Sequence, residues 1–306
     1  MKKIVLFVVA LMSVVSLQAQ GDLHLFEVNN KSGKITPLII EEAFTKNGFS
    51  LGINSEMNGP FTKQFQQTDF KVFTLLTVYH TEFSKDLVNK YPQAGVFIPM
   101  GVGIYQGANE DTLHISMLTA ETQAKILGSD TVILKKIEKA ALKVVNNLLP
   151  NAKHNISKDS LKESRNLVTQ YEMDLDGEDW ADMREEFEMN LEAGFEPFGF
   201  VMPSFMDYNE ELTQEGSVDS PYDFYDTYSI CKLKVIYNVA KTRPEASAFA
   251  PCTTMVYKKK DEDKIVVGFP AVYNWLSSAR IEDKNAHDVL MKAQKDFESI
   301  LKDITE

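Results

Sequence analysis

The sequence of 306 residues is similar to itself at a constant offset of 152 residues. When residues 92–149 are placed over 244–301 without a gap, ten of the 58 positions are identical and the hydrophobic pattern stays in phase. A period of this length exceeds the unit of a solenoid repeat and is typical of a whole domain. The sequence therefore predicts an internal duplication. The recurring residues include Pro92, Phe97, Pro99 and Tyr105, which meet Pro244, Phe249, Pro251 and Tyr257.

The first twenty residues have the pattern of a secretory signal peptide. Lys2 and Lys3 precede an apolar run from Ile4 to Leu17, and Ala19 offers a small residue for cleavage. An uncleaved anchor is the alternative, although the run is short for a spanning helix. We expect cleavage at about residue 19, a periplasmic or secreted protein, and no membrane insertion after cleavage, because no later apolar run reaches the length of a membrane span.

The repeat divides the remaining chain into a first domain (21–150), a polar linker (151–167) and a second domain (168–306). Each domain is expected to open with a short strand, 23–28 or 169–173, and to continue with a helix that ends at Gly48-Phe49 or Gly194-Phe195. Strands follow, with 72–79 matched to 232–237 and 96–105 matched to 248–257, and a long amphipathic helix closes each copy. This order predicts an α+β fold in which each antiparallel sheet carries packed helices (β-α-β-β-β-β-α-like).

The net charge of −12 makes this an acidic protein, and removal of Lys2 and Lys3 would make it more acidic. Such a balance argues against nucleic acid and against anionic lipid surfaces as partners. The sequence contains no glycine-rich phosphate loop, no Gly-x-Ser-x-Gly elbow and no HExxH motif, so it predicts no cofactor.

The stretch from Lys90 to Pro99, followed by a β-rich run to Tyr105, an acidic turn and a second strand, resembles the family called domain of unknown function 302. Thr242 to Pro251, with Tyr257, fits the same pattern. The resemblance covers about 25–149 and 170–301, and implies two tandem copies of a small α+β domain with helices on one face of an antiparallel sheet. It implies no reaction, because none is established for that family as a whole.

The Pro-Phe-Pro clusters are the best candidates for a binding site. One interpretation is structural: the prolines fix the loop that leads into a strand, and the Phe belongs to the core. The other is that they form the rim of an apolar pocket closed by tyrosines. That candidate pocket comprises Tyr79, Pro92, Phe97, Pro99, Tyr105, Tyr237, Pro244, Phe249, Pro251 and Tyr257.

Only two cysteines occur, Cys231 and Cys252, both in the second copy. An exported compartment permits a disulfide between them, and two buried thiols are the alternative. Their expected counterparts in the first copy are the apolar residues Phe73 and Met100. The acidic residues Asp174, Asp176, Glu178 and Glu185 have a spacing similar to that of a calcium loop, so a metal site is one hypothesis for this segment. Asp179 stands where that loop needs Gly, so an acidic helix start is the rival interpretation.

The favoured hypothesis is a non-catalytic module that binds a small, partly apolar molecule or a partner. One alternative is a thiol-dependent enzyme with Cys252 as nucleophile and Arg243 or Glu245 nearby, which requires a thiolate beside a positive charge. The other is a structural interaction protein of the cell envelope.

Overall fold

The computed structural model describes residues 21–162, 167–213 and 220–306, so the predicted signal peptide lies outside the described residues. We call residues 21–162 the first half and residues 167–306 the second half. The first half contains β1 (Leu23–Asn29), α1 (Pro37–Thr45), β2 (Phe49–Glu56), α2 (Asn58–Phe65), β3 (Phe70–His80), α3 (Phe83–Lys90), the 3-10 segment η1 (Pro92–Phe97), β4 (Met100–Gly107), β5 (Thr112–Leu118), α4 (Ala120–Leu127), α5 (Val132–Leu148) and β6 (Lys153–Ile156).

Apart from the additional 3-10 segment η2, the second half follows the same order of elements up to its closing helix. It contains β7 (Val168–Asp174), α6 (Trp180–Phe195), the 3-10 segment η2 (Glu196–Phe198), β8 (Val201–Asp207), α7 (Tyr208–Thr213), β9 (Tyr222–Cys231), α8 (Leu233–Ala240), η3 (Pro244–Phe249), β10 (Cys252–Lys259), β11 (Lys264–Pro270), α9 (Tyr273–Ser278) and α10 (Lys284–Thr305). The predicted α+β class is confirmed: two antiparallel sheets pack against helices.

The two sheets share a strand order. The first is β2-β3-β4-β5-β1-β6 and the second, read from its other edge, is β8-β9-β10-β11-β7. The pairing register also repeats, because Val78 faces Met100 as Ile230 faces Cys252. Both pairs differ by 152 residues, the offset of the sequence repeat. The additional strand β6 lies in the predicted linker and pairs with β1.

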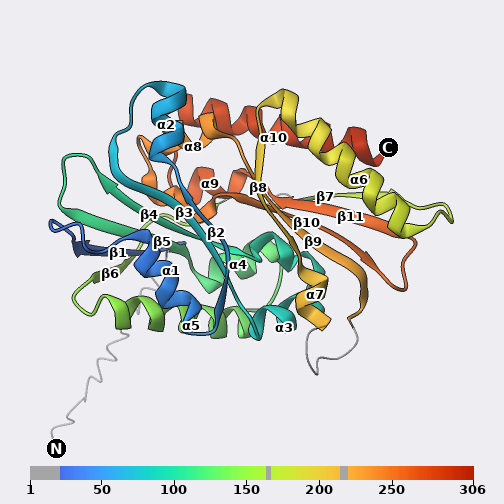
Figure 1. Cartoon of the computed structure of the whole chain (residues 1–306), viewed down its shortest axis with the longest axis horizontal. Coiled ribbons are helices and arrows are strands. Elements are labelled where there is room, and N and C mark those ends of the chain that lie inside the picture. Colours follow the sequence, from blue (N-terminus) through green and yellow to red (C-terminus); the bar gives the residue numbers. More distant parts are fainter. Residues whose placement is uncertain (1–20, 163–166, 214–219) are drawn as a thin grey trace, which may run out of the picture.

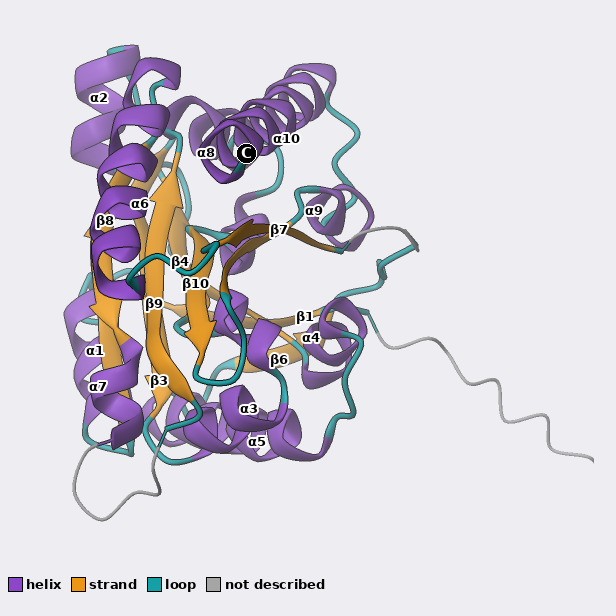
Figure 2. Ribbon diagram, turned by 90° about the vertical axis from the view of Figure 1, so that its right-hand side faces the viewer, coloured by secondary structure: helices purple, strands orange, loops and turns teal. Residues whose placement is uncertain are grey.

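The helices form two layers with the sheets between them (Figure 1), and the turned view shows the strands between these layers (Figure 2). Helices α3, α4 and α5 lie along one side, and α6, α8 and α10 along the other. Two helices cross over: α2 of the first half contacts α8, while Tyr208 of α7 packs edge-on against Tyr79 of the first half. The buried apolar side chains of both halves form one continuous cluster.

The amphipathic pattern places the closing helices as expected. Helix α5 buries Ile137, Ala141 and Val144, which recur at helical spacing. Helix α10 buries Leu290, Ala293, Phe297, Ile300 and Leu301 in the same way. At the other end of the first half, Thr36 caps α1 by accepting a hydrogen bond from the Ile39 N–H.

Three sequence-based assignments were wrong. Residues 232–237 belong to helix α8, and the strand that matches 72–79 is β9. That strand was missed because Asp226, Thr227 and Ser229 interrupt its hydrophobic run although all three are buried. Gly194 does not end α6: the left-handed residue that matches Gly48 is Gly199, with φ values of +74° and +85°. The strands expected from 96 and 248 begin only at Met100 and Cys252, after the 3-10 segments.

The corrected register also changes one cysteine counterpart. Because Val78 corresponds to Ile230, the position equivalent to Cys231 is Tyr79 rather than Phe73. Phe73 corresponds instead to Tyr225, since each faces the matched tyrosine, Tyr105 or Tyr257, on the neighbouring strand. The predicted pairing of Met100 with Cys252 agrees with the register.

Candidate ligand-binding site

The ten residues of the predicted pocket do not gather around one cavity. The six aromatic ones are buried, with exposed fractions of 4–8%. Four of the ten are the prolines that bracket η1 and η3; Pro99 and Pro251 follow cis peptide bonds at equivalent positions. None of the ten lines any of the three cavities described below.

The Pro-Phe-Pro segments instead join the halves. Segment η1 packs on β10 and β11, and η3 packs on β4 and β5, so each half inserts its segment against the other half's sheet. The Tyr225 hydroxyl accepts a hydrogen bond from the Gly95 N–H at 3.0 Å and donates to the Pro92 carbonyl. The Thr253 hydroxyl donates to the Pro99 carbonyl at 3.0 Å. The structural interpretation of these prolines therefore accounts for their contacts.

The four tyrosines of the predicted pocket have separate partners. Tyr237 lies on α8, stacks on Phe65 with ring centroids 4.1 Å apart, and accepts a hydrogen bond from Gln67 at 2.7 Å. Tyr257 stacks on Tyr225, and Tyr105 stacks on His114. Burial raises the pKa of Tyr257 to about 12. These side chains pack in the core and at the boundary between the halves.

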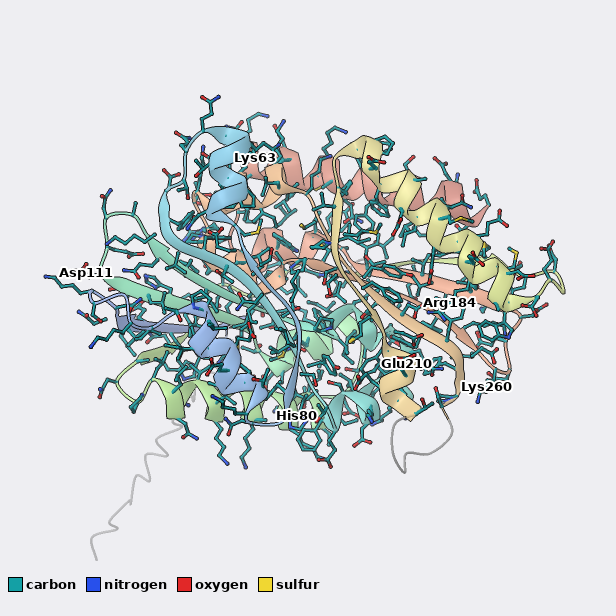
Figure 3. All side chains as sticks on the ribbon, in the orientation of Figure 1. Lys63, His80, Asp111, Arg184, Glu210 and Lys260 are labelled. Carbon is teal, nitrogen blue, oxygen red and sulfur yellow. The ribbon has the colours of Figure 1, made fainter. Side chains whose placement is uncertain are left out.

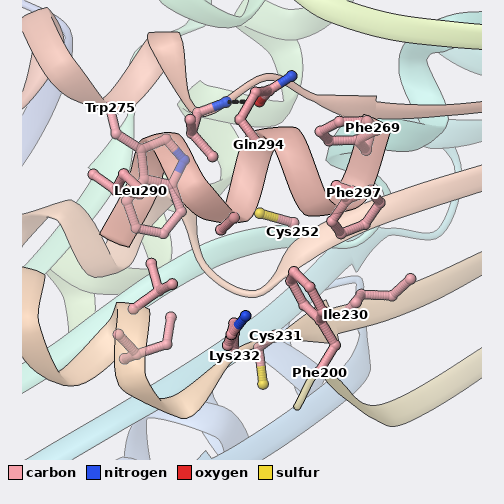
Figure 4. A pocket seen from close by; sticks show the side chains of 14 residues that line it. Phe200, Ile230, Cys231, Lys232, Cys252, Phe269, Trp275, Leu290, Gln294 and Phe297 are labelled. Atoms are coloured by element: carbon pink, nitrogen blue, oxygen red, sulfur yellow. Dashed lines mark hydrogen bonds between the residues drawn. The ribbon is translucent and has the colours of Figure 1, made fainter. Parts of the chain in front are cut away.

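A different cavity lies inside the second half, between its sheet and helices α8, α9 and α10 (Figure 4). It encloses about 30 Å³, which exceeds the space that one water needs. Its wall is almost wholly apolar, an environment in which empty cavities stay dry. The side chains that Figure 4 labels on this wall include Phe200, Ile230, Cys231, Cys252, Phe269, Trp275, Leu290 and Phe297.

Both cysteines face this cavity as free thiols. Cys231 is buried and Cys252 is half-buried, and burial raises the pKa of each thiol to about 12. The only nearby cation among the lining residues is Lys232, whose Nζ pairs with Asp296 at 3.1 Å and lies over the Phe200 ring. The two sulfurs are therefore neutral, polarisable parts of an apolar wall at neutral pH.

One polar group on the wall has no partner. The indole N–H of Trp275 is buried and makes no hydrogen bond within the described structure. Figure 4 shows its nitrogen on the side of the ring that faces the other lining residues. Gln294, by contrast, is satisfied: it accepts from the Val272 N–H at 2.9 Å and donates to Thr169 and Glu298. A buried donor without an acceptor is costly, and it is the group that a ligand oxygen or nitrogen would satisfy.

The cavity coincides with the positions where the two halves differ in side-chain size. Cys252 and Cys231 stand where the first half has the larger Met100 and Tyr79. Trp275 stands where the first half has Gln123, whose amide donates to the Leu118 carbonyl. No sequence motif indicated this site. The sequence did show that both cysteines are smaller than their counterparts in the first half. Because Cys231 was matched with Phe73 instead of Tyr79, only the match of Cys252 with Met100 was correct.

The proposed calcium ligands are not brought together. Asp174 ends β7, Asp176 lies in a turn with φ +52°, and Glu185 lies within α6. Asp179 caps α6 by accepting from the N–H groups of Ala181 and Asp182, as the rival interpretation requires. Across residues 21–162, 167–213 and 220–306, no group of three or more His, Cys, Asp or Glu side chains is arranged to hold a metal ion.

Comparison with known families places the cavity within a recognised segment. Residues 182–304 match the family described as "Domain of unknown function DUF302". All fourteen residues that line the cavity fall inside that match. The match does not extend to the first half.

A similar solved structure is the crystal structure of an uncharacterized conserved protein DUF302 from Bacillus stearothermophilus. It is 17% identical, with a TM-score of 0.36, and the similarity covers 45% of this chain and 98% of that one. The comparison with curated proteins gives no match. None of the helices in the described ranges is long and apolar enough to span a membrane.

Proposed function

We propose that the protein is an exported, non-catalytic binding module that holds a small apolar molecule in the cavity of its second half. The observation that carries this proposal is the unpartnered Trp275 N–H on an otherwise apolar wall. A ligand that fits has few heavy atoms in the cavity, because the enclosed volume is only about 30 Å³. It also offers one hydrogen-bond acceptor to the indole.

The repeated strand order and register support the further proposal that the two halves arose by duplication of one family-like domain. In this interpretation the first half, with Met100 and Tyr79 at the equivalent positions, is the structural partner. The second half keeps the ligand site. The boundaries of the domains follow the predicted linker at 151–167, although β6 within it pairs with the first sheet.

Binding accounts for the two cysteines better than thiol catalysis does. A nucleophilic cysteine needs a thiolate and a positive neighbour. The raised pKa keeps Cys252 protonated at neutral pH, and Lys232 is already paired with Asp296. Arg243 and Glu245, the suggested assistants, line a different cavity. An envelope protein as the bound partner is the other outcome to be tested.

The test uses the two tryptophans, Trp180 and Trp275, whose indole N–H signals separate in a ¹H–¹⁵N spectrum. The full mature chain is titrated with tetrahydrofuran, which has one acceptor, and with cyclopentane, which has none. We expect tetrahydrofuran to shift the Trp275 signal and to leave that of Trp180 unchanged, with a weaker effect from cyclopentane. Native mass spectrometry of protein purified from the exported compartment then looks for the natural ligand, or for an envelope protein instead.

The matched variant is Cys252→Met, which introduces the residue of the first half into the cavity. It should abolish the shift of Trp275 while the protein stays folded. Val201→Met is the control, because it makes a similar change at an exposed position of β8. If the Trp275 signal responds to neither probe, or responds equally in Cys252→Met, the proposed site is wrong.

A further inference from the structure

A second hollow lies on the boundary between the halves and differs in chemistry from the apolar cavity. It encloses about 420 Å³ between β1, β6 and the segment after β6 on one side, and the start of η3 and the end of α9 on the other. A neighbouring hollow of about 510 Å³ shares Asp159 with it. We call the two together the inter-half cleft. The hydroxyl of Ser278 on its wall donates to the buried carboxylate of Asp22, which ties the two sides together.

Basic side chains gather in this cleft although the protein is acidic. Its lining includes five cations, Lys153, Lys158, Lys162, Arg243 and Arg280, against three carboxylates, Asp159, Glu245 and Glu282. The chain as a whole has a net charge of −12. The cleft therefore reverses the charge balance of the molecule, and a recess with an excess of positive charge favours the binding of anions.

Several of these cations have donors to spare. No carboxylate among the described residues lies within ion-pair distance of Lys158 or Lys162. Arg243 donates through Nε to the Arg280 carbonyl at 3.0 Å and through Nη1 to Glu245 at 3.3 Å. A guanidinium has five N–H donors, so these two bonds leave most of its capacity for a ligand. Planar forks of this kind suit carboxylate and phosphate oxygens.

The backbone at Arg280 supplies an independent observation. Arg280 has φ +48°, in the left-handed region that a residue with a Cβ rarely adopts. The equivalent residue of the first half is Gly128, with φ +63°, which ends α4 without that cost. The first half thus shows the residue that the turn alone requires. Arginine in its place carries a conformational cost. It adds to the cleft a guanidinium whose Nε donates to Glu282 at 2.9 Å and whose four other N–H donors remain for a ligand.

We propose that the inter-half cleft binds a small organic oxyanion, a carboxylate or phosphate attached to a short apolar group. Arg243, Arg280 and Lys158 contact its oxygens. The apolar group rests on Leu23, Leu25 and Ala279, which line the first hollow together with Lys158 and Arg243, while Arg280 reaches the oxyanion from the neighbouring hollow. The site depends on both halves, because the segment that carries Lys158 leads from the first half across to the second.

Isothermal titration calorimetry of the full mature chain at low ionic strength tests this site with three probes that each carry one phenyl ring. Phenyl phosphate and benzoate carry the oxyanion, and benzyl alcohol does not. We expect at least one of the anions to bind, benzyl alcohol to show no binding, and added salt to weaken the affinity. The anion that binds with higher affinity shows whether the site prefers a phosphate or a carboxylate.

Arg280→Gly is the decisive variant, since it restores the residue of the first half and should fold at least as well. We expect it, and Lys158→Gln, each to weaken the anion by about tenfold, the scale of one charge-assisted hydrogen bond. Lys63→Gln, an exposed change on α2, should bind like the wild type. Cys252→Met should also bind the anion normally, which separates this site from the apolar cavity. Equal binding of benzyl alcohol, or wild-type affinity in the Arg280→Gly, Lys158→Gln double variant, would overturn the proposal.

Discussion

The two halves have the same strand order and register but different interiors. Where the first half places Met100 and Tyr79, the second places Cys252 and Cys231 and encloses a cavity. Where the first half has Thr74, buried and uncharged, the second has Asp226, buried and held by Arg184. The comparison teaches that the same strand order and register accommodate interiors of different side-chain volume and charge, and that the smaller side chains of the second half accompany its cavity.

Of the changes predicted here, removal of the Arg184 guanidinium in the second half should cause the largest loss of stability. Arg184 binds both oxygens of Asp226 at 2.8 Å and also contacts Asp207 and Glu188. Figure 3 shows it where α6 passes over the sheet, whereas Lys63, Asp111 and Lys260 lie at the periphery. Arg184→Ala leaves Asp226 buried without its partner, so chemical denaturation should show a loss of about 3–5 kcal/mol in the free energy of unfolding.

The first half suggests how that loss can be reversed. The double variant Arg184→Leu, Asp226→Thr removes both buried charges and installs the residue that stands at the equivalent position, Thr74. We expect it to be clearly more stable than Arg184→Ala. Lys284→Ala breaks an exposed pair with Asp288 and should leave the free energy of unfolding close to that of the wild type, because water screens such a pair. A double variant as unstable as Arg184→Ala would show that the two interiors are not interchangeable.

A substitution that creates an equivalent cavity in the first half should reduce the free energy of unfolding by an intermediate amount. Met100 is buried, and Met100→Cys removes part of its side chain from the packed interior. The expected loss is about 1–2 kcal/mol by chemical denaturation, because the surrounding side chains collapse only partly into the space. The reverse change, Cys252→Met, should cost less, since it fills space that is already empty. Equal losses in both variants would contradict the assignment of the cavity to the second half alone.

The smallest effect on stability at neutral pH is expected from the ionisation of the Cys231 and Cys252 thiols. Each has a pKa of about 12 against an ordinary 9.0, so the folded state holds the proton more tightly than the unfolded state. This contribution to stability is fully present below pH 9 and is lost as the pH rises from about 9 to 12. At pH 8 we expect iodoacetamide to label the folded chain far more slowly than the chain in denaturant. Labelling at equal rates would mean that the thiols are exposed, and no labelling of the unreduced, unfolded chain would reveal a disulfide.

Much of the fold could be predicted because its signals are local. The closing helices carry an apolar face at helical spacing, and the opening strands expected at 23–28 and 169–173 correspond to β1 and β7. Their registers agree, because Phe26 faces Ile115 as Tyr171 faces Val267. Strand β9 was missed because Asp226 breaks its apolar run, and only the distant Arg184 makes that burial tolerable. Helix α8 was read as a strand because a short apolar run fits both periods.

The candidate sites were harder to predict than the fold. The Pro-Phe-Pro segments recur in both halves and so suggest a site, yet in each half the segment packs on the sheet of the other half. The apolar cavity involves residues spread from Phe200 to Phe297, with no motif of their own. The inter-half cleft joins Lys158 to Arg243 and Arg280, which no spacing in the sequence relates.

The sequence by itself determined the α+β class and the amphipathic faces of the closing helices, because these depend on residues close together in the chain. Only the tertiary structure decided which buried donor lacks a partner, where small side chains leave a space, and which charges meet across the boundary of the halves. Those properties depend on distances between residues far apart in the sequence, and such distances exist only once both sheets have packed together.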